Sequence, residues 1–191
     1  MEIAPVNHGL WRFWGRDRRL LAEGIPAQHA RRRRMKDMTL NQGSRGTIWV
    51  VVQFVLMFAL LASGLVWRAQ WVGWWPWLPG VALLLVGAWA GLSGERALGA
   101  NRTPFPRPKH DSQLITSGIY AHVRHPLYVA VLALGFAWAL LWRSGPALAL
   151  ALVQVGFFDA KARREERWLR ERHAEYAAYA RRVKRFVPGI Y

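Results

Sequence analysis

Long apolar runs, separated by strongly charged segments, constrain the fold of this chain more than any other feature. Residues 47–67 form an apolar run that begins at Thr47 and is interrupted only by Gln53, Ser63 and Gly64. A helix of that length can cross a hydrocarbon core of about 30 Å. A soluble basic protein would instead distribute its apolar residues at helical or strand spacing. The segregation of the two residue classes is therefore typical of an integral membrane protein.

The hydropathy pattern predicts an all-α polytopic membrane protein with about four transmembrane helices. The expected spans are residues 47–67, 75–94, 126–142 and 145–159, and the last two form a short helical hairpin. A cytoplasmic amphipathic helix is expected over residues 161–182. The second span contains small residues suited to close helix contact, namely Gly87, Ala88, Ala90 and Gly91.

Charge predicts the orientation of these spans. The chain has 27 Lys and Arg against 11 Asp and Glu, a formal net charge of +16. Ten of the basic residues lie in residues 1–46, five in 95–126 and ten in 159–191, whereas the other two connections hold only Arg68 and Arg143. The positive-inside rule then predicts that both termini, the central loop and any site on that loop lie in the cytoplasm. The membrane that we expect is a bacterial inner membrane. Nucleic-acid binding is the rival interpretation of the charge, but no nucleic-acid-binding motif accompanies it.

Two further features limit the function classes. The chain has no cysteine, which excludes disulfides, thiolate catalysis and zinc–thiolate sites. Residues 1–46 are basic and hold no signal peptide; they form either an interfacial helix or a disordered extension. The run Arg31–Arg34 would lie against anionic lipid headgroups.

The stretch from Gly118 to Tyr128 concentrates polar side chains directly before an apolar run. Proline is tolerated in the first turn of a helix, so Pro126 predicts a helix start with His125 just outside it in a non-helical conformation. Polar groups at a helix N-terminus make a plausible anion site. Tyr120, Arg124 and Tyr128 are spaced by four, so a helical continuation would place them on one face.

The hairpin topology brings this stretch close to the Glu165–Glu166 pair, because both ends of the hairpin return to the same side of the membrane. Each residue taken alone also has a plainer interpretation. Tyr128 would be an interfacial tyrosine, Arg124 a topogenic charge, and the two glutamates solvated charges on an arginine-rich helix. Periodicity and charge thus predict a polar pocket at the membrane boundary without naming a reaction.

The second half of the chain contains an ordered set of motifs. They are Leu114-Ile115-Thr116-Ser117-Gly118-Ile119-Tyr120, Arg124-His125-Pro126-Leu127-Tyr128, Glu165-Glu166-Arg167-Trp168-Leu169, Tyr176 with Tyr179, and Arg185-Phe186-Val187-Pro188. In the order and spacing of these motifs the chain resembles the superfamily of isoprenylcysteine carboxyl methyltransferases and phospholipid methyltransferases, over about residues 100–190. Two differences are Leu127, where the family often has Met or Ser, and His173-Ala174, where Phe-Gly is usual.

The resemblance implies a membrane methyltransferase that uses S-adenosylmethionine and takes a lipophilic substrate from the bilayer. Glu165 would bind the ammonium or ribose of the cofactor, with Glu166 beside it, and Lys161 would contact the substrate. The other cofactor-lining residues that the resemblance implies are Gln113, Leu114, Ile115, Tyr120, His125, Pro126, Leu127 and Tyr128.

The chemistry of these residue types is consistent with that activity. Arg124, His125 and a helix N-terminus suit the methionine carboxylate, and a glutamate suits its ammonium. An amine or thiol acceptor would need a general base, for which Glu166 is the candidate, whereas a carboxylate acceptor needs none. The acceptor remains open among prenylcysteine-like carboxylates, phospholipid amines and small thiols, and so does the oligomeric state. The alternatives are an NADPH-dependent membrane reductase of the sterol-reductase type and a non-enzymatic membrane adaptor.

Overall fold

The computed structural model describes residues 46–99 and 113–191, and the regular structure in these ranges is helical. The prediction of an all-α fold is confirmed for this part of the chain. The predictions made for residues 1–45 lie outside it. The helices are Gly46–Val66, α2 (Trp77–Leu98), the short 3₁₀ helix η3 (Gly118–Ala121), α3 (Pro126–Leu141), α4 (Gly145–Arg172) and α5 (Tyr176–Arg182).

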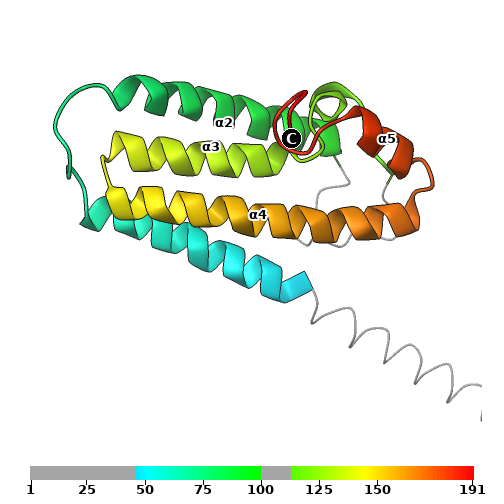
Figure 1. Ribbon diagram of the computed structural model, residues 1–191, viewed down its shortest axis with the longest axis horizontal. Coiled ribbons are helices and arrows are strands. Elements are labelled where there is room, and N and C mark those ends of the chain that lie inside the picture. The colour runs from blue at the N-terminus through cyan, green and yellow to red at the C-terminus, as the bar shows by residue number, and fades with distance from the viewer. Residues whose placement is uncertain (1–45, 100–112) are drawn as a thin grey trace, which may run out of the picture. The chain divides into compact units, whose positions relative to one another are not determined.

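The four long helices lie side by side with alternating direction (Figure 1). The connection after the first helix meets the α3–α4 turn, where the N–H of Ala69 donates to the carbonyl of Trp142 at 2.9 Å and that of Gln70 to Arg143 at 3.0 Å. At the opposite end of the bundle lie the start of α3, the second half of α4, and the short helix α5.

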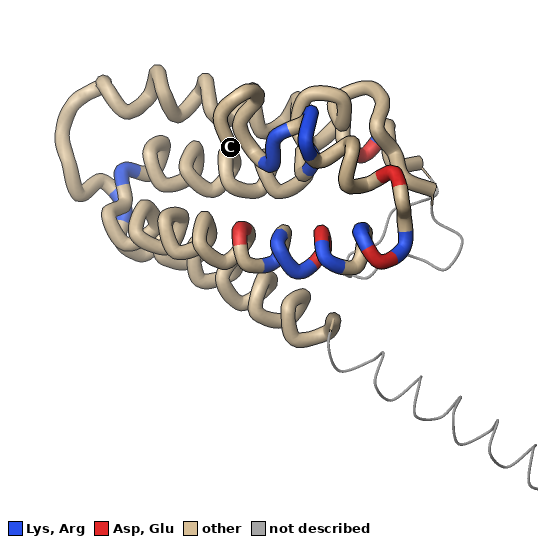
Figure 2. Tube along the Cα trace, turned by 45° about the vertical axis from the view of Figure 1, so that its right-hand side comes forward, with Lys and Arg blue, Asp and Glu red and all other residues tan. Residues whose placement is uncertain are grey.

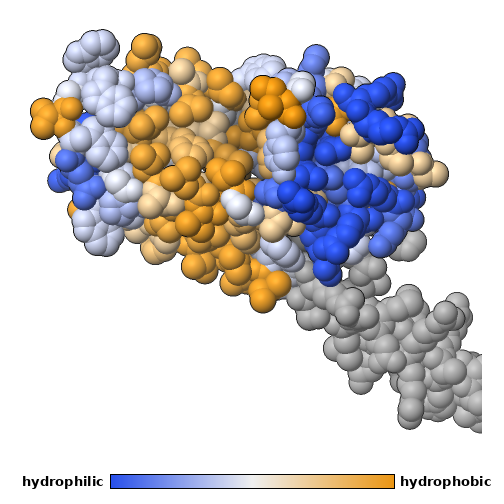
Figure 3. All heavy atoms as spheres, viewed as in Figure 1, coloured by the Kyte–Doolittle hydropathy of each residue, from blue (hydrophilic) through white to orange (hydrophobic). Residues whose placement is uncertain are grey.

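Two of the helices, Gly46–Val66 and α2, are long and apolar enough to cross a membrane, and α3 is a shorter apolar helix. Most of their large apolar side chains are exposed, and Figure 3 shows them as an orange band over the middle of the molecule. The charged residues lie mainly beyond this band, on the second half of α4 and around α5 (Figure 2). Four crossings and their orientation remain predictions.

The predicted boundary between the hairpin and a separate cytoplasmic helix at residues 161–182 is wrong. One helix, α4, runs without interruption through both predicted elements and ends at Arg172. No Gly or Pro stands between Phe157 and Arg172, so nothing in that stretch breaks the helix. The break comes at His173, whose backbone is extended, and α5 follows it. The Glu165–Glu166 pair is therefore rigidly connected to the hairpin.

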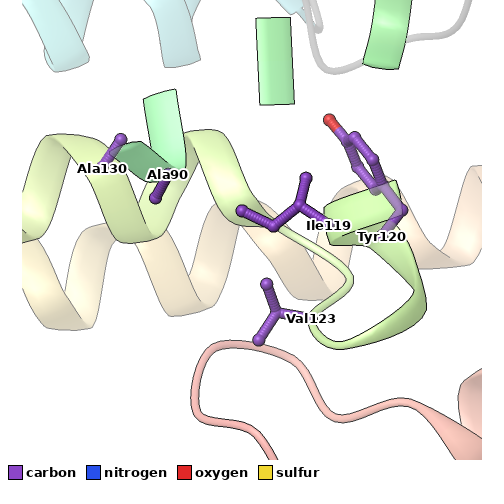
Figure 4. Close-up of a cluster of buried hydrophobic side chains, with 5 residues drawn as sticks. All are labelled: Ala90, Ile119, Tyr120, Val123 and Ala130. Carbon is purple, nitrogen blue, oxygen red and sulfur yellow. The ribbon is translucent and has the colours of Figure 1, made fainter. Parts of the chain in front are cut away.

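Small residues allow α2 and α3 to pack closely. A Cβ added at Gly87 would lie 2.9 Å from the Cγ of Leu134 and 3.1 Å from the carbonyl oxygen of Ala130. Gly87 and Ala90 are buried as the sequence predicts, whereas Ala88 is exposed. Figure 4 shows Ala90 and Ala130 of these helices together with Ile119 and Tyr120 of η3 and with Val123, which follows it. This buried cluster, Ala90, Ile119, Tyr120, Val123 and Ala130, holds the Gly118–Tyr128 stretch against the helices.

Candidate active site

The predicted helix start at Pro126 is confirmed. Pro126 is the first residue of α3, and His125 precedes it with non-helical dihedral angles (φ −126°, ψ 61°). Both residues are buried, and the N–H groups of Tyr128 and Val129 donate to the carbonyl of His125 at 3.1 Å. The backbone thus fixes the position of the imidazole at the end of the bundle.

His125 lies between Glu165 and Glu166 of α4. Its Nε2 is 3.2 Å from the Oε1 of Glu166, and its Nδ1 is 3.8 Å from the Oε2 of Glu165. The fold therefore brings the Arg-His-Pro motif and the glutamate pair together, as the hairpin topology predicts. His125 and Glu166, which make the closer contact, are 41 residues apart in the sequence. The imidazole also stacks on the ring of Tyr128, with the ring centroids 5.1 Å apart.

Glu166 is shared by several cations. Its side chain is 1% exposed, and its Oε1 lies 3.1 Å from Nη2 of Arg124 and 2.9 Å from Nε of Arg185. Its Oε2 accepts a bond from Nη2 of Arg185 at 3.1 Å, with Arg170 at 3.7 Å. Burial by itself would raise the pKa of Glu166, but hydrogen bonds from His125 and Arg185 and the charge of Arg124 lower it to about 2. Glu166 is therefore an anion near neutral pH, and both of its oxygens are occupied.

Glu165 has a different environment. Its Oε2 accepts a bond from the hydroxyl of Tyr128 at 2.6 Å, and its side chain is 26% exposed. The bond from Tyr128 directs the carboxylate towards the start of α3. Glu165 is therefore the accessible carboxylate of the site, and Glu166 the internal one.

Lys161 lies one turn before this pair and is 2% exposed. Its ammonium donates to the amide oxygen of Gln53, in the first helix, and lies 5.2 Å from the centroid of the Tyr128 ring. It also lies 5.9 Å from the centroid of the Phe158 ring. The side chains in contact with this buried cation are thus a neutral amide and two aromatic faces, and the charge of Glu165 also acts on it.

The remaining residues that the resemblance implies lie around the same end of the bundle. Leu114 packs against the buried cluster of Tyr176, Tyr179 and Val183, and Ile115 against the one in Figure 4. Leu127 is directed at α2, since a Cβ on Gly94 would meet its Cδ2 at 2.9 Å. Three others are Gln113, which is exposed, and Tyr120 and Pro126, which are buried.

The two tyrosines of α5 connect this helix to the site. The hydroxyl of Tyr179 donates to the carbonyl of Tyr120 at 2.6 Å, and Nη1 of Arg124 donates to the carbonyl of Ala180 at 2.9 Å. Burial, partly offset by Arg124, raises the pKa of Tyr179 to about 12. Tyr176 is buried, and its hydroxyl finds no hydrogen-bond partner within the described residues.

Sequence reasoning assigned no role to three residues that contact the site. Gln53 was visible only as a polar interruption of an apolar run. A carboxylate oxygen of Asp159 lies 2.8 Å from Nη1 of Arg185. In the sequence, Asp159 stands at the end of an apolar segment, a position that indicates only a charge at the membrane interface. Arg185 belongs to a matching motif, yet nothing in its spacing indicates that it contacts Glu166.

The arrangement can bind a small zwitterion. The guanidinium of Arg124, whose Nε has no hydrogen-bond partner within the described residues, suits a carboxylate, and the accessible Glu165 suits an ammonium. No cluster of three or more potential metal ligands occurs in residues 46–99 and 113–191.

Comparisons with known proteins agree with the resemblance found in the sequence motifs. A sequence profile described as phospholipid methyltransferase matches residues 75–176. The cobalt-zinc-cadmium resistance protein CzcN of Cupriavidus metallidurans is 34% identical over 179 residues, which cover 86% of this chain and 73% of that protein. The nickel-cobalt-cadmium resistance protein NccN of Alcaligenes xylosoxydans xylosoxydans is 30% identical over 150 residues, covering 75% of this chain and 64% of that protein. The chain therefore belongs to the phospholipid methyltransferase family, part of the isoprenylcysteine carboxyl and phospholipid methyltransferase superfamily.

Proposed function

We propose that the protein is an S-adenosylmethionine-dependent methyltransferase that works at the membrane surface on a lipophilic acceptor. The observation that carries this proposal is the position of His125 between the two glutamates, with Tyr128 bonded to Glu165. Family membership supplies the reaction class, methyl transfer. The site supplies groups of both charges for the amino-acid part of the cofactor.

The cofactor fits the polar groups that the protein leaves open. The Nε of Arg124 and the hydroxyl of Tyr176 are buried and have no hydrogen-bond partner within the described residues. A polar ligand at the start of α3 would satisfy such groups. Glu165 would hold the ammonium or ribose and Arg124 would hold the carboxylate, while His125 would line the cofactor between them. The walls of the site would include Gln113, Leu114, Ile115, Tyr120, Pro126, Leu127 and Tyr128.

Glu165 and Glu166 have different proposed roles. A general base must accept a proton near neutral pH, and Glu166, with a pKa of about 2 and both oxygens occupied, is poorly suited to that. We assign Glu166 the role of orienting His125 and Arg124 in place of the general base expected from sequence. Bound cofactor would supply an electrophilic methyl group on its sulfonium, and the protein would align the acceptor with it.

Lys161 is the residue proposed to face the acceptor. A buried ammonium whose partners are an amide and aromatic rings retains affinity for an anion, such as a carboxylate or phosphate of the acceptor. The exposed apolar surfaces of the first helix and α2 would let a lipophilic acceptor approach from the bilayer.

The charged end of the molecule is proposed to lie at the cytoplasmic face, against anionic headgroups. Exposed basic residues gather there beside the apolar band, visible as blue next to orange in Figure 3. Each such residue near a membrane surface contributes about 1 kcal/mol of attraction. They are Arg163, Arg167, Arg170, Arg172, Arg181, Arg182 and Lys184.

The names of the two relatives add a physiological proposal. Both are described as resistance proteins for cobalt, cadmium and either zinc or nickel. We propose that methyl transfer by this chain contributes to metal tolerance. A strain whose only copy carries Glu165→Gln should then grow as poorly on these metal salts as a deletion strain; growth equal to wild type would contradict the link.

Transfer of a labelled methyl group from S-adenosylmethionine into membranes that contain the protein tests the reaction and names its acceptor. Wild-type membranes should yield a labelled product, and Glu165→Gln membranes should yield at least about tenfold less, since a charge-assisted contact to the cofactor is lost. Glu171→Gln makes the same change at an exposed position of α4 and should match wild type. Equal labelling by all three variants would contradict the assignment.

A further inference from the structure

The chain segment after α5 lies against the Arg-His-Pro motif. We call residues 183–191 the C-terminal hook. Lys184 forms a parallel bridge with Val123. The N–H of Arg124 donates to the carbonyl of Lys184 at 2.9 Å, and that of His125 to the carbonyl of Arg185 at 3.2 Å. The backbone at His125 is therefore fixed by the hook as well as by α3.

The guanidinium of Arg185 joins two carboxylates of α4. Its Nε and Nη2 bond the two oxygens of Glu166 at 2.9 and 3.1 Å, and its Nη1 bonds Asp159 at 2.8 Å. The hydroxyl of Tyr191 closes the group, since it donates to Asp159 at 2.8 Å and accepts from Arg185 at 3.0 Å. Such a bidentate pair is stronger and more directional than a single ion pair.

Arg185 reaches His125 through Glu166. An ionised Glu166 requires a proton on the Nε2 of His125, 3.2 Å from its Oε1. The other ring nitrogen, Nδ1, faces the accessible carboxylate of Glu165 at 3.8 Å. A second proton, on Nδ1, would turn that approach into an ion pair and occupy Glu165.

We propose that Arg185 is a positioning residue that keeps a single proton on His125, at Nε2, and thereby leaves Glu165 free for the ammonium of the cofactor. The inference rests on the proposed function. Without the charge of Arg185, the anion of Glu166 would be balanced by Arg124 and His125, which favours a second proton on the imidazole. The charged and titratable groups around the His125–Glu166 pair are Glu165 and Arg170 from α4, Arg124 and Tyr128 from the motif, Tyr176 and Tyr179 from α5, and Arg185 from the hook.

Calorimetric binding of S-adenosylmethionine by the purified full chain in detergent, near pH 6 and near pH 8.5, tests this. The dissociation constant of the wild-type chain should differ by less than about threefold between the two pH values. Arg185→Gln should bind about tenfold more weakly near pH 6 than near pH 8.5, and Arg185→Lys, which retains the charge, should keep the wild-type ratio. Arg182→Gln, an exposed change in α5, is the matched control.

The outcomes separate the two proposals. Absence of binding by wild type would reject the proposed function, whereas binding by wild type with no pH-dependent loss in Arg185→Gln would reject the inference. A histidine ¹⁵N spectrum of the wild-type chain, with His125 assigned from His125→Gln, tests it even if Arg185→Gln does not fold. A proton on Nε2 alone at neutral pH is the expected result, and a proton on Nδ1 would overturn the proposal.

Discussion

Glu165 and Glu166 are neighbours in sequence with opposite environments. One accepts a single bond from Tyr128 and is open to a ligand, and the other has both oxygens bonded by cations and is buried. The positions of their side chains on α4 create this difference, since adjacent helical residues point about 100° apart. A sequence motif written as a pair of glutamates therefore contains two distinct roles.

The buried carboxylate of Glu166 makes the stability of the fold depend on pH. The pKa of Glu166 is lowered from 4.5 to about 2, so its ion pairs stabilise the fold fully above about pH 4.5 and are lost as the pH falls towards 2. Thermal unfolding in detergent should show a melting temperature that decreases over this range for wild type and Glu171→Gln, and less steeply for Glu166→Gln. An equally steep decrease in Glu166→Gln would contradict this assignment.

At the scale of elements, close approach of α2 and α3 holds the Arg-His-Pro motif in place. Gly87→Ala would set a Cβ 2.9 Å from Leu134 and 3.1 Å from a backbone carbonyl, which cannot rotate away. Crowding of this kind costs about 1–3 kcal/mol. Gly156→Ala adds the same methyl group to α4 where nothing lies within 4 Å, and gains up to about 1 kcal/mol of helix propensity. The melting temperature should therefore decrease for Gly87→Ala and stay level or rise for Gly156→Ala. An equal change of the melting temperature in both variants would contradict the packing argument.

How far sequence predicts such elements depends on whether the cause is local. Pro126 determines a helix start by its own geometry, and that prediction is confirmed. The meeting of His125 with the glutamates followed from chain direction and turn length. The continuity of α4 was missed because a change from apolar to charged residues alters the solvent of a helix without breaking it. The contacts of Gln53 and Arg185 join segments far apart in the chain, and no local pattern contains them.

At the scale of the whole molecule, the basic residues predict the orientation. The chain has no cysteine, so single-cysteine variants report accessibility without a background. Val72→Cys lies in an exposed connection and Ala178→Cys on α5, at the opposite end of the bundle. A membrane-impermeant maleimide applied to spheroplasts should label the first directly and the second only after lysis, because basic segments stay in the cytoplasm. The reverse pattern would contradict the predicted topology.

The central claim is that the end of the bundle holding His125 and Glu165 binds S-adenosylmethionine. The most direct measurement is a calorimetric titration of the intact chain in detergent with this cofactor, repeated in the presence of NADPH. We expect one site per chain, no competition by NADPH, and binding at least about tenfold weaker in His125→Ala and Glu165→Ala. No binding of S-adenosylmethionine by the wild-type chain, or displacement of it by NADPH, would contradict the account and favour a reductase or a non-enzymatic membrane protein.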